Sequence, residues 1–169
     1  MGKVLISTSS PILEKIPFSG DKGVYVSVIP TEDTLKVLSE VAEVLGFNPD
    51  PSKFHVTVMY SKKAPSSVQT YGSKIHNATL DKVEVFTGHD DKNYLAAKLQ
   101  SDSLQFLHKS WCKRGAEHSF DSLMPHVTLW SDVEVTPQLT TRVDALNKRL
   151  GRKPLRCKFH RETVSDLKD

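Results

Sequence analysis

Two short stretches of this chain share one pattern: residues 54–58 read Phe-His-Val-Thr-Val, and residues 125–129 read Pro-His-Val-Thr-Leu. Both stretches are rich in β-branched and apolar residues, which favour extended strands. Side chains two positions apart in a strand project from the same face. The histidine and the threonine of each motif are therefore expected to project together, while the intervening valine faces the opposite side, toward a core.

An imidazole and a hydroxyl on each strand suit the cleavage of a phosphodiester bond. Of His55 and His126, a neutral ring can take a proton from an attacking hydroxyl and a protonated ring can give one to the leaving oxygen. The hydroxyls of Thr57 and Thr128 can bind the non-bridging phosphate oxygens. This chemistry needs no metal ion or other cofactor. One such motif alone is more often a histidine near a core, but two in equivalent strands favour catalysis around a shared anion pocket.

The predicted elements repeat in order around the two motifs. A strand, a helix and a motif strand occur twice, and a further helix and strand follow the second set. We expect an α+β fold in one domain spanning residues 23–165, with two halves related by an approximate two-fold axis and an N-terminal arm at residues 1–22. The expected strands cover residues 24–29, 54–60, 79–86, 94–99, 126–130 and 155–163, and the expected helices cover residues 31–45, 102–113 and 139–150.

Composition narrows the class of protein. The chain has 169 residues and a net charge of +3, which is compatible with an anionic ligand but far from the charge of a protein that coats nucleic acid. We therefore expect no long nucleic acid as a partner. Cys112 and Cys157 belong to no CxxC pair and are expected to be free thiols in a reducing cytoplasm. No Cys/His cluster has zinc-ligand spacing, and no apolar stretch reaches the length of a membrane span.

With both motifs in place, the chain resembles the two-histidine (2H) phosphoesterase superfamily, which is defined by two His-x-Thr/Ser motifs. The resemblance covers about residues 20–165. Within the superfamily the chain is similar to bacteriophage enzymes that counter CBASS, an antiphage immunity based on cyclic oligonucleotides, on the segments 23–28, 55–63 and 125–129. The resemblance implies a bilobal fold with two antiparallel sheets related by a pseudo-two-fold axis, helices packed outside and a central cleft.

The same resemblance implies a reaction. A ribose 2′-hydroxyl attacks the adjacent 3′–5′ phosphodiester of a cyclic di- or trinucleotide such as 3′,3′-cGAMP, and the ring opens through a 2′,3′-cyclic phosphate. One histidine acts as base and the other as acid, in the host cell cytoplasm if the enzyme is viral. Tyr25 and Glu162 are the positions that match the family's nucleotide contacts. An ordinary sheet tyrosine and a solvated carboxylate are equally compatible with these positions.

Two residues beside the motifs are candidates on their own chemistry. Lys62 follows the first motif strand and can steer a phosphate, although exposed lysines commonly only add solubility. Trp130 follows the second motif and can either stack on a base or pack at the rim of the core.

Two other functions would use the same residues. The first is an RNA-processing 2H enzyme that opens terminal 2′,3′-cyclic phosphates or trims oligoribonucleotides. The sequence has no basic cluster of four or more residues, which mildly disfavours long RNA as the substrate of such an enzyme. The second is a silent module that sequesters a nucleotide signal, which has no need for two proton-transfer groups. The substrate's bases and ring size stay open, and an oligomer is compatible with the sequence.

Overall fold

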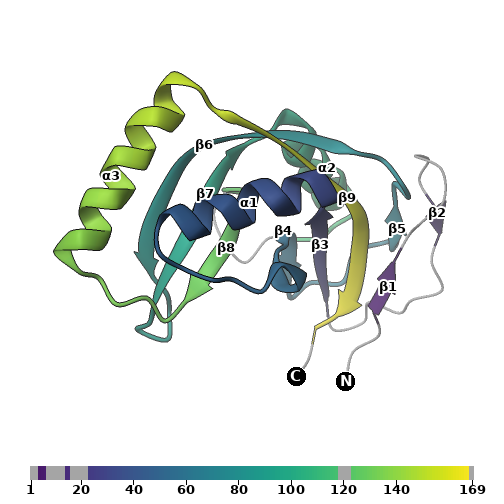
Figure 1. The fold of residues 1–169 in the computed structure, drawn as a ribbon. Coiled ribbons are helices and arrows are strands. Elements are labelled where there is room, and N and C mark those ends of the chain that lie inside the picture. The colour runs from purple at the N-terminus through teal and green to yellow at the C-terminus, as the bar shows by residue number, and fades with distance from the viewer. Residues whose placement is uncertain (1–3, 7–13, 16–22, 118–122, 168–169) are drawn as a thin grey trace.

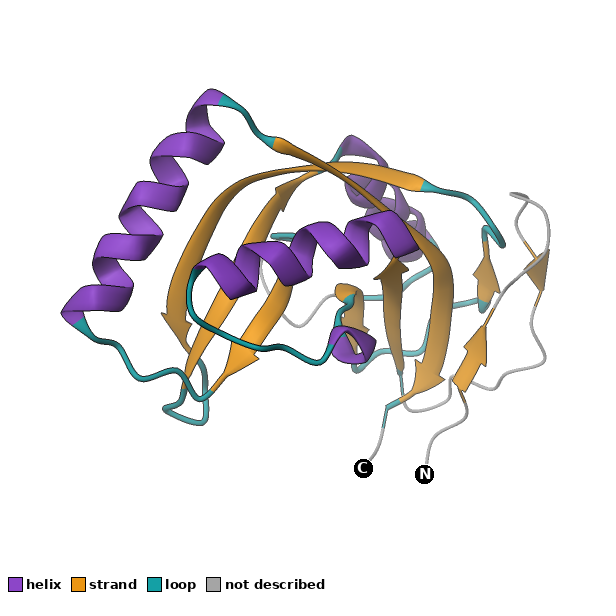
Figure 2. Ribbon diagram, viewed as in Figure 1, coloured by secondary structure: helices purple, strands orange, loops and turns teal. Residues whose placement is uncertain are grey.

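The computed structural model describes residues 4–6, 14–15, 23–117 and 123–167, and its architecture is α+β, as the sequence predicted (Figures 1 and 2). The helices are α1 (Glu32–Val44), α2 (Asp102–Lys113) and α3 (Pro137–Arg152), with a short 3₁₀ helix, η1 (Pro51–Lys53). The strands are β1 (Val4–Ile6), β2 (Glu14–Lys15), β3 (Val24–Pro30), β4 (Val56–Ser61), β5 (Gln69–Thr70), β6 (His76–Thr87), β7 (Asn93–Gln100), β8 (His126–Ser131) and β9 (Leu155–Asp166). Of the expected N-terminal arm, only β1 and β2 fall within the described residues.

The main sheet is antiparallel and symmetric in its strand order. Its strands follow the order β4-β3-β9-β6-β7-β8, with β1 paired to β9, while β2 and β5 form a separate two-stranded sheet. The unit β3-α1-β4 occupies one end of the order and the unit β7-α2-β8 occupies the other. The repeated strand-helix-strand unit is thus present, and each motif strand is the outermost strand of its half.

The two halves belong to one sheet, which differs from the two separate sheets expected. The reason is β9, which is 12 residues long and reaches both halves. Its first part, Leu155–Phe159, pairs with β6 at His76–Leu80, and its second part pairs with β3. A strand that pairs on both sides in this way joins the halves by a continuous ladder of backbone hydrogen bonds.

Both motif strands carry an irregularity at the same place. In β4, Val58, which follows Thr57, has no paired residue in the neighbouring strand. In β8 the same is true of Leu129, which follows Thr128. An extra residue of this kind bends a strand and increases its local twist. The equivalent bulges support a shared local geometry for the two motifs.

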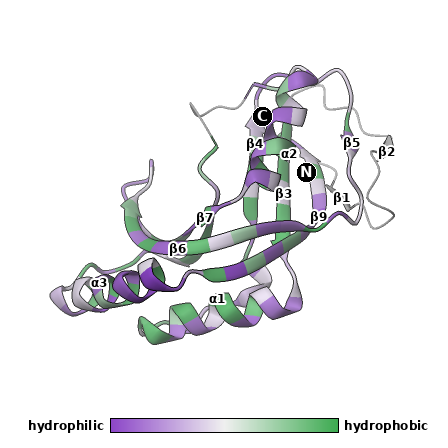
Figure 3. Cartoon of the chain, turned by 90° about the horizontal axis from the view of Figure 1, so that it is seen from above, coloured by the Kyte–Doolittle hydropathy of each residue, from purple (hydrophilic) through white to green (hydrophobic). Residues whose placement is uncertain are grey.

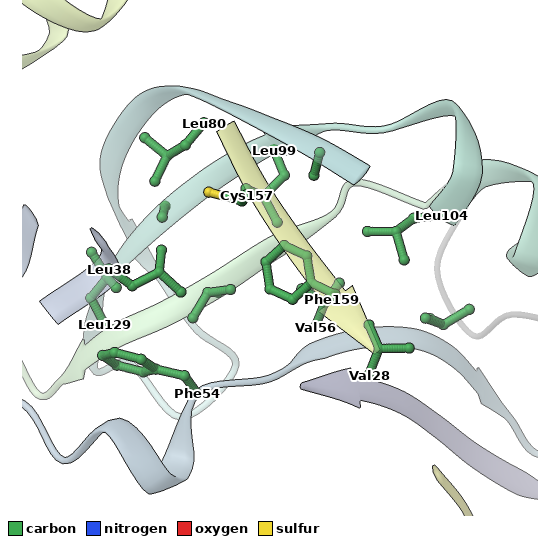
Figure 4. Close-up of a cluster of buried hydrophobic side chains, with 14 of the residues drawn as sticks. Val28, Leu38, Phe54, Val56, Leu80, Leu99, Leu104, Leu129, Cys157 and Phe159 are labelled. Atoms are coloured by element: carbon green, nitrogen blue, oxygen red, sulfur yellow. The ribbon is translucent and has the colours of Figure 1, made fainter. Parts of the chain in front are cut away.

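The sheet curls until its two outermost strands approach each other. β4 and β8 are not neighbours in the hydrogen-bonded order, yet some of their Cα atoms lie within 8 Å of one another. The core fills the inside of this curl. Leu38 of α1 and Leu104 of α2 lie in the same buried cluster as Val56 of β4 and Leu129 of β8 (Figure 4). Helix α1 contacts β8 and α2 contacts β4, so each helix packs against the motif strand of the other half.

Helix α3 lies outside this repeat and covers β6. It buries one apolar stripe and leaves its remaining surface hydrophilic (Figure 3). The side-chain amide of Asn147 accepts a hydrogen bond from the backbone nitrogen of Val83 and donates one to its oxygen, both at 2.8 Å. This amide thus takes the place of a neighbouring strand where β9 has turned away from β6. Within the described residues, no helix is both long and apolar enough to cross a membrane.

Candidate active site

The two motif histidines are held in the same way. Nδ1 of His55 lies 2.9 Å from the backbone oxygen of Lys53, and Nδ1 of His126 lies 3.1 Å from the backbone oxygen of Met124. A carbonyl oxygen only accepts hydrogen bonds, so Nδ1 must carry the proton in both contacts. The other ring nitrogen, Nε2, is then the one that can exchange a proton with a ligand. Each ring is fixed by the residue two positions before it.

Buried residues immediately before the histidines anchor both motifs. Phe54 is 3% exposed and packs in the core, where it lies near Leu129 (Figure 4). In the second motif the buried Pro125 accepts a hydrogen bond from the backbone nitrogen of Leu99 at 3.0 Å. These anchors fix the backbone from which each imidazole projects.

The motif residues lie on the outer side of β4 and β8, away from the core. Val56 and Val127, which alternate with the motif residues, are fully buried. Thr57, His126 and Thr128 are half-buried and His55 is exposed. β4 and β8 approach each other and turn Val56 and Val127 into one core, so each His-x-Thr pair lies on the face of its strand that points away from that core.

Small residues lie beside both threonines. The register places Ser27 directly opposite Thr57 and Ala96 directly opposite Thr128. Both small residues are on the outer face, and both are buried, with 9% and 1% exposed. The two motifs thus share a short, covered side chain directly across from the threonine.

Tyr25 lies at the first motif. Its hydroxyl is 2.8 Å from Oγ1 of Thr57, and its ring lies edge-on to His55 with ring centres 6.4 Å apart. Burial raises the pKa of Tyr25 above its usual value, against the opposing effect of the bond to Thr57. The phenol therefore stays protonated near neutral pH and can hold the threonine hydroxyl in position.

A second aromatic residue, which the sequence did not single out, lies against the histidine of the second motif. Phe86 lies edge-on to His126 with ring centres 5.7 Å apart, and Tyr94 stacks on Phe86 at 5.5 Å. The predicted pairing of two neighbouring strands could have suggested the contact between Phe86 and Tyr94. Their position against His126 depends on the curl of the sheet, for which the sequence holds no local signal.

Glu162 is not placed as the predicted nucleotide contact requires. It is 1% exposed, and its two oxygens accept hydrogen bonds from the backbone nitrogen of Tyr71 at 2.8 Å and from Nε1 of Trp111 at 2.7 Å. Burial raises the pKa of this carboxyl to about 6, an effect opposed by these two bonds and by Arg114. The carboxylate thus connects β9 to α2 inside the protein. The residue of β9 that faces the same side as Ser27 and Thr57 is Thr163, and Glu162 points to the opposite side.

The two candidates taken from single residues also lie away from the histidines. Lys62 is exposed beyond the far end of β4, about 20 Å along the strand from His55. The Trp130 ring packs on Phe47 with ring centres 5.4 Å apart and lies against the core. The bulge at Leu129 explains this orientation, because it breaks the alternation that would have placed Trp130 on the side of Thr128.

Among the residues that the structure describes, no group of three or more His, Cys, Asp or Glu side chains could hold a metal ion. The free thiols predicted from the sequence are Cys112, which is exposed, and Cys157, which is buried.

Comparison with known proteins identifies relatives over most of the chain. A family model described as anti-CBASS protein Acb1 matches residues 22–169. The anti-CBASS protein Acb1 of Vibrio phage KVP40 is 33% identical over 125 residues, which are 71% of this chain and 80% of the relative. The proteins of the same name from Acinetobacter phage Ac42 and Enterobacteria phage T4 are 34% and 35% identical, over 67% and 63% of this chain and 75% and 70% of theirs.

Proposed function

Because the chain belongs to the anti-CBASS protein Acb1 family, we propose that it is a metal-independent phosphodiesterase that opens cyclic di- and trinucleotide signals of CBASS immunity. The observation that carries this proposal is the equivalent anchoring of His55 and His126 through Nδ1, on two strands that approach each other. The symmetric strand order supports the assignment of the fold to the 2H superfamily, with the substrate cleft between the motif strands.

In the proposed reaction, Nε2 of one histidine takes the proton from a ribose 2′-hydroxyl as its oxygen attacks the adjacent phosphorus. The bond from phosphorus to the 5′-oxygen breaks, and Nε2 of the other histidine, which is protonated at the start, gives its proton to that oxygen. The ring opens to a linear product that ends in a 2′,3′-cyclic phosphate. Thr57 and Thr128 bind the non-bridging oxygens as their charge changes, and Tyr25 positions Thr57.

The reaction is tested by incubating the purified protein with 3′,3′-cGAMP in the presence of EDTA and following the products by mass spectrometry. We expect a linear dinucleotide with a terminal 2′,3′-cyclic phosphate. Intact substrate alongside an active control enzyme would contradict the proposal. Faster turnover of 2′,3′-cyclic mononucleotides would instead favour the RNA-processing activity. Tight binding without turnover, unchanged in the His55→Ala and His126→Ala variants, would favour a nucleotide-sequestering module.

Loss of the Thr128 hydroxyl is expected to slow the reaction without unfolding the protein. Thr128→Val keeps the shape of the side chain and removes one hydrogen bond to a charged phosphate, so kcat should fall about 10–100-fold. The variant is measured by steady-state kinetics next to Thr128→Ser, which keeps a hydroxyl and should retain most activity. Thr141→Val, at an exposed position of α3, is the matched control. An unchanged kcat in Thr128→Val would remove the threonine from the mechanism.

A further inference from the structure

A row of basic side chains crosses three strands and ends at the second motif. The register pairs Lys82 of β6 with Lys98 of β7, and Lys98 in turn with His126 of β8. Directly paired residues of an antiparallel sheet project from the same face and lie next to each other. Lys98 is therefore the immediate cross-strand neighbour of the imidazole, and Lys82 lies one strand further away.

A cavity lies next to this row. It has a volume of about 450 Å³, and its lining includes Asp81 as well as Lys82, Lys98, Gln100, Gln105 and Pro125. Lys98 and Gln100 alternate with buried residues of β7, so they project on the face of the sheet that carries His126. Pro125 directly precedes the histidine in the chain. The cavity thus begins where the second motif begins, and its volume falls within the range of roughly 300–1,000 Å³ that is usual for small-molecule sites.

The lysines at the cavity are held in place. Oε1 of Glu84 lies 3.4 Å from Nζ of Lys98, and its Oε2 lies 3.7 Å from Nζ of Lys82. The Lys98 side chain is only 29% exposed. Asp81 also lines the cavity, so the charged side chains of the lining are two ammonium groups and one carboxylate, a small positive balance that is compatible with an anionic ligand.

The first motif has no such lysine. Ser27 lies opposite Thr57 as Ala96 lies opposite Thr128, so the position in β3 that corresponds to Lys98 is Ile29. Ile29 pairs with His160 of β9 and is half-buried. Two motifs that are otherwise built alike therefore differ in the charge beside the histidine, and a ligand can distinguish one side from the other.

We propose that this cavity is the subsite for the second nucleotide of a cyclic substrate, with Lys98 binding the phosphate that is not cleaved. The inference rests on the proposed function. A cyclic dinucleotide has two phosphates, and when one lies between the histidines the other must lie to one side. The side that has the cavity, and Lys98 next to the imidazole, is that of His126. Gln100 supplies an amide group at the cavity wall for the sugar or base, and Gln105, whose Nε2 donates to the backbone oxygen of Leu123 at 3.0 Å, supplies its amide oxygen.

The test compares a substrate with two phosphates and a substrate with one. For Lys98→Gln we expect KM for 3′,3′-cGAMP to rise about 10-fold or more with little change in kcat, because a charged contact made in both ground and transition state is lost. Cleavage of the linear dinucleoside monophosphate ApA, which has only one phosphate, should be unchanged. Lys98→Arg should keep the low KM, and Lys148→Gln, at an exposed position of α3, is the matched control.

The outcomes separate the subsite from the function. If the unaltered protein cleaves neither substrate, the proposed function fails and the subsite with it. If it cleaves both and Lys98→Gln changes neither KM, only the subsite is wrong. An equal loss on both substrates would also overturn the subsite, because Lys98 would then act at the cleaved phosphate. Binding of 3′,3′-cGAMP to His55→Ala, with and without Lys98→Gln, measures the same contact by calorimetry without turnover.

Discussion

Alanine at His126 is expected to lower kcat for 3′,3′-cGAMP by about 10²–10⁴-fold, the contribution typical of a general acid or base. His55→Ala should have an effect of the same size, because the two rings are anchored alike and each moves one proton in the proposed reaction. The double variant should lose less than the product of the two single losses, since residues that act as a unit are not additive. Single-turnover and steady-state rates measure these losses.

The fold should survive both substitutions. His55 is exposed, and the described hydrogen bond of each ring goes to a backbone oxygen only two residues away. Thermal unfolding should therefore show little change in Tm. His89→Ala, at an exposed position of the β6–β7 turn, is the matched loss of an imidazole and should keep its activity. A normal rate in either motif variant would withdraw that histidine from the mechanism.

The pH profile gives an independent view of the two histidines. A reaction that needs one neutral and one protonated imidazole has a bell-shaped dependence of kcat/KM on pH. Each alanine variant should lose one limb of the bell in its residual activity, and the limb that disappears identifies the ring as base or acid. Profiles with the same shape in both variants and in the unaltered protein would contradict the assignment of proton transfer to these rings.

Trp111→Phe is expected to destabilise the protein by about 3 kcal/mol at pH 7. Trp111 is fully buried, and its Nε1 donates to Oε2 of the buried Glu162 at 2.7 Å. The substitution removes a hydrogen bond to a charged group, which contributes about 1.5–3 kcal/mol, and leaves a small void. Denaturant unfolding measures the loss. Trp130→Phe is the matched control, because the described contacts of Trp130 include no carboxylate.

The size of this loss should depend on pH. The pKa of Glu162 is raised from 4.5 to about 6 in the folded protein, so the folded state holds this proton more tightly than the unfolded state. The contribution of Glu162 to stability is therefore fully present below pH 4.5, and about 2 kcal/mol of it is lost as the pH rises through 6. Without the Trp111 donor the pKa should rise further, so Trp111→Phe should be more destabilising at pH 8 than at pH 5.

Glu162→Gln provides the reference for this pH effect. Glutamine does not titrate, so the difference in unfolding free energy between the unaltered protein and Glu162→Gln should fall as the pH rises from 4.5 to 6.5. A difference that stays constant or rises over this range would show that the carboxyl is not held as the structure describes. In Glu162→Gln the side-chain NH₂ group faces one of the two buried donors, the backbone nitrogen of Tyr71 or Nε1 of Trp111. The variant should therefore be less stable than the unaltered protein over the whole pH range.

Periodicity and short motifs predicted the elements of this fold well. The alternation of Val24, Val26 and Val28 and the repeat of the His-x-Thr strands placed β3, β4 and β8, and the helices followed from their apolar faces. The joining of the halves into one sheet could not be predicted in the same way. It depends on where along β9 the partner changes from β6 to β3, which is a property of long-range pairing.

The candidate site was predictable only where the chemistry lies in a local pattern. The strand period alone placed the four motif residues on one side of their strands. For Trp130 the sequence left stacking on a base and packing at the core both open, and the ring packs toward the core because the bulge at Leu129, which has no local sequence signal, shifts the alternation. Glu162 was expected, from the resemblance, to contact the nucleotide or else to be solvated, whereas two donors from distant segments hold it inside the protein. Phe86 and Lys98 were missed because their neighbour His126 is brought to them by strand pairing.

The bulges beside the two threonines influence the distance between the two motif histidines. His55 and His126 belong to strands at opposite ends of one hydrogen-bonded order, so the gap between their rings is determined by how strongly the intervening strands coil. Insertion or loss of a single residue at a bulge alters that coiling. Relatives could thus change the distance between the two imidazoles, and so fit cyclic nucleotides of larger or smaller ring size, while every side chain that contacts the substrate stays the same.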